Sequence, residues 1–244
     1  MPKQPASRSE QLFAAAVHIY TATGVIWGFL MIVAAFHGNA TLALWANLVA
    51  QVVDGTDGAL ARRFRVKEIL PSVDGRRLDD IVDYLTYVFA PIVLLWGLGY
   101  LPAGVAGIIV GVIPLLASSY QFSQVEAKTD DHSFLGFPSY WNVVAFYVVV
   151  LNLSPTITAL VLIFWAIMVF VPIHYLYPSR MTSLRTLTLT LTALWMVSYG
   201  LILTQMPNPN QLLVVISLLY MAYYFFLSVY KTLAKDQRRQ LPAD

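Results

Sequence analysis

Two pairs of aspartates lie at the adjoining ends of two long apolar segments, within residues 54–83. On a helix Asp54 and Asp57 are three positions apart and Asp79 and Asp83 four apart, so each pair shares one face. Two such helices facing each other would gather four carboxylates. A carboxylate inside an apolar helix costs roughly 3 kcal/mol on insertion scales, so the four require compensation by opposite charge. Ligands that are all oxygen favour a hard divalent cation, Mn²⁺ or Mg²⁺.

The residues directly after Asp57 suit a phosphorylated ligand. Gly58 and Ala61 reduce side-chain bulk beside the acids, so a flat or phosphorylated ligand can approach the helix backbone. Arg62 adds a cationic fork next to them. Acids, metal and arginine around small residues are typical of a site that holds a pyrophosphate for phosphoryl transfer.

Four polar side chains near the acids have two interpretations each. Asn47 and Gln51 lie on the same stripe of the helix as Asp54, and they either bind nucleotide or a metal-bound water or hydrogen-bond to a neighbouring helix. Arg76 and Arg77 either contact a substrate phosphate or attract anionic lipid headgroups, at about 1 kcal/mol per residue.

The composition predicts an all-α polytopic membrane protein. Of the chain, 58% is hydrophobic and 11% charged, with a mean hydropathy of +0.66, whereas an ordinary soluble domain is near one quarter charged. Its 244 residues leave room for about eight transmembrane helices in a single domain, 1–244. The expected spans cover about 12–36, 41–63, 76–100, 104–121, 139–153, 157–177, 182–203 and 212–233.

The distribution of charge predicts the orientation. In this assignment all fifteen basic residues fall on one side of the membrane, and the loops on the other side contain none. The positive-inside rule then places the N-terminal segment 1–11, the C-terminal tail 234–244 and the aspartates on the cytoplasmic side. The chain has no cysteine, which excludes thiolate metal sites and a cysteine nucleophile.

The order and spacing of the acids, glycines and arginine resemble the signature of the CDP-alcohol phosphotransferases, which are integral-membrane enzymes that displace CMP from a CDP-linked lipid or alcohol. Residues 63–74 form a spacer of twelve residues, where most members have eight. This spacer and the segments 75–91 and 136–147 resemble the bacterial phosphatidylcholine synthase branch. The residues that carry the family signature are Asp54, Asp57, Gly58, Ala61, Arg62, Gly75, Asp79 and Asp83.

The resemblance implies a bacterial inner-membrane enzyme that transfers the phosphatidyl group from CDP-diacylglycerol to choline and releases CMP. It implies that one or two Mn²⁺ or Mg²⁺ ions are held by Asp54, Asp57, Asp79 and Asp83, and that Asp83 is the general base. Membrane lipids are expected partners and nucleic acid is not. The small-residue spacing of Gly104, Gly107 and Gly111 suits either a homodimer seam or packing within the chain.

Four aromatic residues are candidates for binding choline, because aromatic faces hold a quaternary ammonium. They are Tyr84, Tyr87, Tyr140 and Trp141. Tyr and Trp at helix ends also form the ordinary aromatic belt of a membrane protein.

Two other functions remain open on the sequence. The acceptor could be serine, glycerol phosphate or inositol phosphate, since the basic residues near the acids could bind a phosphorylated acceptor. A divalent-cation transporter also carries intramembrane carboxylates. Transport requires access from both sides, whereas every acid is expected near the cytoplasmic side.

Overall fold

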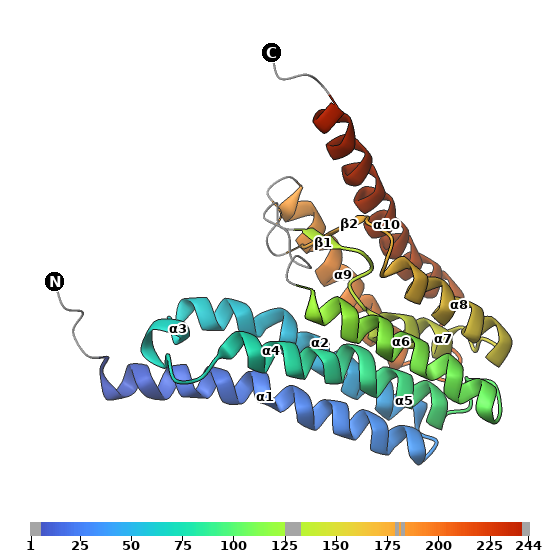
Figure 1. Ribbon diagram of the computed structural model, residues 1–244. Helices are drawn as coiled ribbons and strands as arrows, with labels where there is room; N and C mark the ends of the chain where they lie inside the picture. Colours follow the sequence, from blue (N-terminus) through green and yellow to red (C-terminus); the bar gives the residue numbers. More distant parts are fainter. Residues whose placement is uncertain (1–5, 125–132, 179–180, 182–183, 241–244) are drawn as a thin grey trace. The chain divides into compact units, whose positions relative to one another are not determined.

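The computed structural model describes residues 6–124, 133–178, 181 and 184–240, and its contacts divide the chain into two compact units, Met1–Leu98 and Gly99–Asp244. Figure 1 shows the elements of both units in sequence colours. Each unit is described by itself below. The prediction of one domain over 1–244 therefore stays a prediction.

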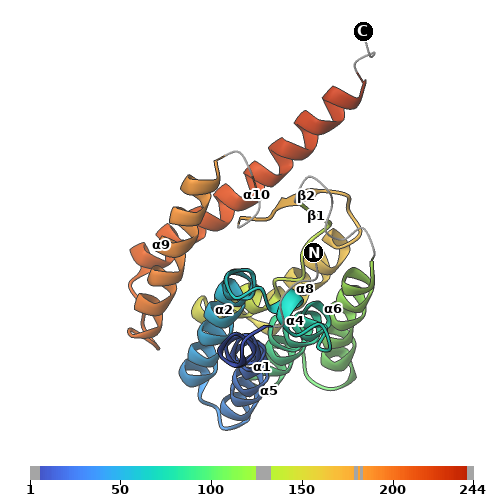
Figure 2. The same cartoon turned by 90° about the vertical axis from the view of Figure 1, so that its left-hand side faces the viewer.

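The first unit is a bundle in which α1 contacts each of its other helices. Its elements are α1 (Arg8–Phe36), α2 (Ala40–Arg63), the short α3 (Val66–Ile69), α4 (Gly75–Asp83), the π-helix η1 (Tyr84–Phe89) and α5 (Ala90–Gly97). The last three follow one another without a break. Figure 2 views α1 nearly end-on, with α2 and α5 beside it.

Local chemistry sets the ends of these helices. Ser7 and Glu10 form a capping box at the start of α1, so two backbone N–H groups of the first turn are satisfied. Asn39 caps α2 by accepting a hydrogen bond from the N–H of Leu42. Because the loop between α1 and α2 is short, the two helices run antiparallel as neighbours.

Two glycines on α1 allow the helix that follows residue 75 to approach closely. A Cβ atom at Gly24 would clash with Cγ1 of Val82, and one at Gly28 would lie 3.3 Å from Cγ of Leu85. Val82 is buried. The small residues of α1 thus fix the depth at which α4 and η1 pack.

The second unit contains helices and one two-stranded sheet. Within it, α6 packs against α8, α9 packs against α10, and β2 contacts both β1 and α10. The strands pair antiparallel, with Ser133 opposite Leu176 and Leu135 opposite His174. Its elements are α6 (Val105–Ser123), β1 (Ser133–Leu135), α7 (Trp141–Val150), α8 (Pro155–Met168), β2 (His174–Leu176), α9 (Arg185–Leu203) and α10 (Gln211–Gln240).

The predicted spans coincide with helical segments, with one clear error. The sixth was expected to continue to residue 177, whereas α8 ends at Met168 and residues 174–176 form β2. Pro172 explains the stop, because proline lacks the N–H that an α-helix needs and disfavours helical backbone in the residue before it. The all-α prediction is therefore wrong for the six residues of this sheet.

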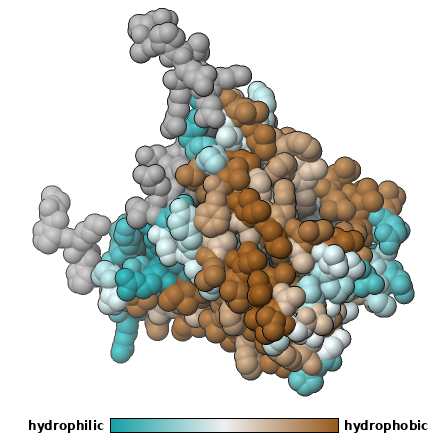
Figure 3. Space-filling view, turned by 45° about the vertical axis from the view of Figure 1, so that its right-hand side comes forward, coloured by the Kyte–Doolittle hydropathy of each residue, from teal (hydrophilic) through white to brown (hydrophobic). Residues whose placement is uncertain are grey.

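In the described part of the chain, the helices long and apolar enough to cross a membrane are α1, α6, α9 and α10 up to Lys235. The apolar helices α7 and α8 are shorter, and α2 and α4 carry the acids. The count of eight spans thus stays a prediction. Large apolar side chains are exposed on these helices, among them Ile19 at 67%, Leu116 at 66% and Leu219 at 63%. Figure 3 shows an extended hydrophobic surface, as expected of a multi-pass membrane protein.

The glycines of α6 have a local explanation. Gly104 has a positive φ of 68°, which favours glycine in the turn before the helix. A Cβ atom at Gly107 would clash with the carbonyl oxygen of Pro102. This packing within the chain accounts for two of the three small residues, and nothing in the described residues bears on a homodimer.

Candidate active site

Two antiparallel elements of the first unit carry the predicted acids. Asp54 and Asp57 lie in the second half of α2, and Asp79 and Asp83 lie in the two turns of α4. Asp74 caps α4, because its Oδ1 accepts hydrogen bonds from the N–H groups of Arg76 and Arg77 at 3.1 and 3.2 Å. The cap fixes where α4 begins, and so which residues face α2.

Three of the carboxylates meet across the two helices. Asp54, Asp57 and Asp79 each offer an oxygen, and these oxygens all lie within 4.8 Å of one another. Asp57 is buried, with 5% of its surface exposed, and the other two are half-buried. Such a set of carboxylate oxygens fits a hard divalent cation. Asp83, one turn beyond Asp79, is not in this group, and its predicted roles as ligand and as base stay predictions.

Helix α1 also contributes to the cluster, which the sequence did not predict. The side chain of Thr21, which is buried on α1, lies close enough to the Asp57 carboxylate to stabilise its charge. In the sequence Thr21 is one of three neighbouring hydroxyl residues of an apolar span, with Tyr20 and Thr23, and nothing there singles it out. Only the packing of α1 beside α2 gives Thr21 its position.

Tyr87 has a contact that its predicted role did not anticipate. From η1, its hydroxyl donates a hydrogen bond to Oδ2 of Asp54. Asp79, Asp83 and Tyr87 are spaced four residues apart, so the sequence did contain the signal that they share a helix face.

The small residues after Asp57 leave space beside the cluster. Among the side chains of the described residues, a Cβ atom at Gly58 would meet only the tip of Arg62, with Nη1 at 3.4 Å. The guanidinium of Arg62 therefore folds back over Gly58 and acts electrostatically on Asp57. Gly58, Ala61 and Arg62 thus lie on the acid-bearing half of α2. Their role in holding a pyrophosphate stays a prediction.

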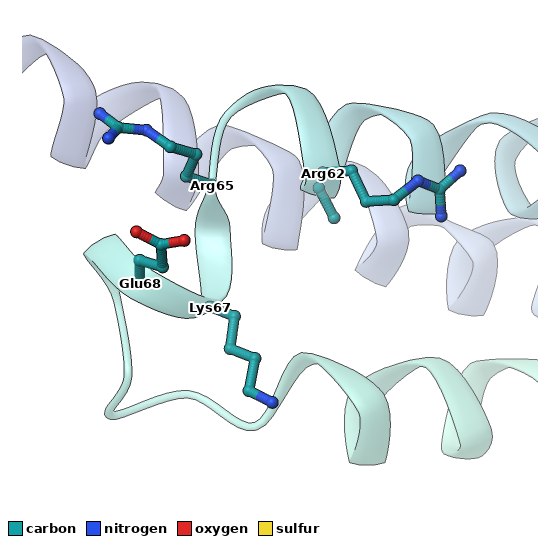
Figure 4. A pocket seen from close by; sticks show the side chains of 5 residues that line it. Arg62, Arg65, Lys67 and Glu68 are labelled. Carbon is teal, nitrogen blue, oxygen red and sulfur yellow. The ribbon is translucent and has the colours of Figure 1, made fainter.

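A basic pocket of about 330 Å³ lies at the end of α2 (Figure 4). Arg62 and Arg65 point away from each other along the helix direction, and Lys67 extends from α3 toward α4. Arg65 donates to Oε1 of Glu10 at 2.7 Å, an exposed pair that contributes little stability. The pocket is lined by Ala61, Arg62, Arg65, Lys67 and Glu68. Two of these lining residues, Lys67 and Glu68, belong to α3 and lie in the twelve-residue spacer 63–74.

The predicted polar pair of α2 is buried and joined together. Nε2 of Gln51 donates to Oδ1 of Asn47 at 3.4 Å, and Asn47 is fully buried. This bond within one helix is neither of the two contacts that the sequence suggested. A role for Asn47 and Gln51 in nucleotide binding stays a prediction.

Gly75 permits a close approach of α1 to the start of α4. A Cβ atom there would lie 2.9 Å from Cε1 of His18, which is tighter than side chains tolerate. Nε2 of His18 is buried and has no hydrogen-bond partner within the described part of the chain. The side chains of Arg76 and Arg77 are exposed, which suits either a phosphate or lipid headgroups.

The four aromatic candidates divide between the units. Tyr84 and Tyr87 lie in η1, directly after Asp83, and both are half-buried. Trp141 is fully buried in the second unit, where its indole N–H donates to Oγ of Ser118 at 2.7 Å. Tyr140 is half-buried beside Tyr224, with ring centroids 6.2 Å apart. A common choline site of all four stays a prediction.

Comparison with known proteins places these residues in a family. The profile of the CDP-alcohol phosphatidyltransferases matches residues 16–176. A phosphatidylcholine synthase of Legionella pneumophila is 39% identical over 95% of this chain and 93% of its own length. One from Pseudomonas aeruginosa is 37% identical over 87% and 88%, and one from Borreliella burgdorferi is 33% identical over 91% and 95%.

Proposed function

The chain belongs to the CDP-alcohol phosphatidyltransferase family, and from that premise we propose that it transfers the phosphatidyl group from CDP-diacylglycerol to choline and releases CMP. The observation that carries this proposal is the meeting of Asp54, Asp57 and Asp79 at the positions of the family signature. The relatives align with this chain over most of their length and its own, and they are named phosphatidylcholine synthases, which supports choline as the acceptor.

The three carboxylates account for metal dependence. Three acids within 4.8 Å of one another repel strongly unless a cation or protons lie between them. A bound Mn²⁺ or Mg²⁺ would neutralise the charge of the pyrophosphate and of the transferring group. Asp54, Asp57 and Asp79 would hold one or two such ions, with Asp83 as a further ligand where it is not acting as a base.

Asp83 is the proposed general base. The oxygen of choline attacks the phosphorus of the phosphatidyl group while the bond from that phosphorus to the CMP oxygen breaks, and the hydroxyl proton passes to the Asp83 carboxylate. A choline hydroxyl is a much weaker acid than a carboxylic acid, so the proton moves only as charge develops at the attacking oxygen. Electrostatic stabilisation is therefore expected to be the larger contribution.

The nucleotide and its pyrophosphate are assigned to the small-residue half of α2. Gly58 and Ala61 allow close approach, and the guanidinium of Arg62 lies beside Gly58, where its planar fork could bind a phosphate. Gly75 completes this set, and Asn47 and Gln51 are assigned to the nucleotide as well. We also assign phosphate contacts to Arg76 and Arg77, because their side chains are exposed at the start of α4.

We assign choline to the aromatic faces of Tyr84, Tyr87, Tyr140 and Trp141. A permanent cation without an N–H donor is best held by such faces near anionic groups. Tyr84 directly follows the proposed base in the sequence, which favours its place beside the reacting hydroxyl.

The location follows from the charge distribution and the relatives. The protein is a multi-pass membrane protein, and we place it in the bacterial inner membrane with both termini and the active site in the cytoplasm. All fifteen basic residues fall on that side in an eight-span assignment. Attachment of a cysteine-reactive probe to single cysteines introduced at residues 38 and 239 would test this, since only the first is expected to react from outside.

The decisive experiment is an assay of the purified protein with CDP-diacylglycerol, Mn²⁺ and separate acceptors. We expect CMP and phosphatidylcholine with choline, and little product with serine, glycerol phosphate or inositol phosphate. A preference for one of these other acceptors would overturn the choline assignment but leave the transferase assignment in place. Uptake of Mn²⁺ into liposomes without CMP formation would instead indicate a transporter.

A further inference from the structure

The π-helix η1 directly follows Asp83 and presents Tyr87 to the metal-binding acids. The first residue of η1, Tyr84, directly follows Asp83 in the chain. The fourth, Tyr87, donates a hydrogen bond to Asp54, which lies 33 residues earlier in the sequence. Asp54 belongs to the carboxylate cluster. Tyr87 therefore links the helix that carries Asp79 and Asp83 to the helix that carries Asp54 and Asp57.

A proline explains why the helix widens at this place. Pro91 lies in the first turn of α5, and it has no N–H to donate to the carbonyl of Tyr87, four residues before it. The N–H of Ala90 instead reaches back five residues to the carbonyl of Leu85. Short π-helical turns inside α-helices occur frequently at functional sites.

The π turn changes the direction of Tyr87. In an α-helix, a residue four positions on lies about 40° past a full turn, so Asp79, Asp83 and Tyr87 would drift around the helix. A π turn closes its hydrogen bond one residue later, so the same four positions rotate less. The widening thus brings Tyr87 back toward the face that Asp79 presents to α2.

We propose that Tyr87 is a positioning residue, which orients Asp54 for metal binding through its hydroxyl, and that this is the function of the π turn. The inference rests on the proposed metal-dependent transfer. A carboxylate has two oxygens and about four lone-pair sites, so Asp54 can accept from Tyr87 and still bind an ion. Partners of this kind fix the orientation of metal ligands, and their loss typically costs 10- to 100-fold in metal affinity or activity.

This role differs measurably from that of an aromatic face for choline. Tyr87→Phe keeps the ring and removes only the hydroxyl. If the ring alone matters, the KM for choline and the metal requirement both stay close to wild type. If the hydroxyl positions Asp54, metal affinity falls while the KM for choline is unchanged.

A matched control exists on the same bundle. The hydroxyl of Tyr20 on α1 hydrogen-bonds to Oγ1 of Thr56 on α2 at 2.8 Å. Thr56 adjoins Asp57 but is not a carboxylate. Tyr20→Phe therefore removes a hydrogen bond between helices at the same end of α2 without touching a metal ligand.

The experiment measures Mn²⁺ binding to the purified variants by electron paramagnetic resonance, without lipid substrate or choline. We expect Tyr87→Phe to bind Mn²⁺ 10- to 100-fold more weakly, with a matching rise in the Mn²⁺ concentration for half-maximal activity, and Tyr20→Phe to bind within 3-fold of wild type. Equal binding by Tyr87→Phe and wild type would overturn the inference. So would an equal loss in Tyr20→Phe, which would indicate a general effect of helix packing.

A double variant separates positioning from global damage. If Tyr87 acts through Asp54, adding Tyr87→Phe to Asp54→Asn should weaken Mn²⁺ binding by no more than about 3-fold further. Effects that multiply in full would show that the residues act independently, and would refute the inference. These binding measurements are independent of the acceptor assay. If the wild type bound Mn²⁺ but made no phosphatidylcholine, the proposed function would be refuted and the inference about Tyr87 would not.

Discussion

Substituting Gly58 by alanine adds one methyl group where the ligand is proposed to approach α2. Outside the backbone of its own helix, the one atom of the described residues that this methyl would approach within 4 Å is Nη1 of Arg62, at 3.4 Å. Because that atom is the end of a long flexible side chain, it can move at little cost. Alanine also favours a helix interior over glycine by roughly 0.5–1 kcal/mol. The protein without ligand should therefore be as stable as wild type or slightly more stable.

The expected effect on activity has the opposite sign. A misfit of one methyl group in a binding site costs about 1–3 kcal/mol, which corresponds to about 10- to 200-fold in kcat/KM. We expect this loss mainly as a higher KM for CDP-diacylglycerol, with the KM for choline little changed. The assay is CMP release at varied CDP-diacylglycerol, together with thermal unfolding of the same preparations in detergent.

Gly55→Ala is the matched control. Gly55 is exposed on the same helix, and a Cβ atom there would have no neighbour within 4 Å among the described residues outside its own helix backbone. The Gly55→Ala variant should gain the same helix stability as Gly58→Ala, while its kcat/KM stays within about 3-fold of wild type. If Gly58→Ala retained the wild-type KM for CDP-diacylglycerol, the idea that Gly58 admits the ligand to the backbone would be wrong.

Three further variants test the assigned roles. Asp83→Asn should reduce kcat by at least about 10²-fold while CDP-lipid binding is retained, and near-normal turnover would remove it as the base. Asp57→Ala should weaken Mn²⁺ binding and nucleotide binding together, because one of three clustered carboxylates is lost. If calorimetric titrations showed that nucleotide binding to this variant still depends on Mn²⁺ as in wild type, the cluster would not be the metal site. Tyr84→Ala should raise the KM for choline by about 2- to 30-fold, which is the loss expected for a cation–π contact, whereas Tyr84→Phe should keep a KM close to that of wild type. An unchanged KM for choline in steady-state assays of Tyr84→Ala would exclude Tyr84 from the choline site.

The helices and the acid pairs follow from local sequence. Long apolar runs specify helices in a membrane, since every backbone polar group there must be satisfied within the segment. The spacing of Asp54 and Asp57 fixes their common helix face without reference to the rest of the chain. The family signature likewise depends only on residue order, and the match over residues 16–176 confirms it.

The end of α8 shows where apolarity alone misleads. Residues 169–177 are mostly apolar, yet the chain leaves the helix at Met168, and β2 pairs with β1 from about forty residues earlier. Pro172 was visible in the sequence, but its partner strand was not, because pairing between distant segments depends on tertiary structure.

Contacts between helices were decided only by packing. The spacing pairs Asp54 with Asp57 and Asp79 with Asp83, and the expected site of four carboxylates depended on the two helices facing each other. The structure brings Asp79 together with Asp54 and Asp57 and gives Asp54 a hydrogen bond from Tyr87. Spacing determines which residues share one face of a helix. Which faces meet, and at what depth, depends on the clearance that Gly24 gives to Val82 and on the π turn before Pro91, and these act only when the helices pack.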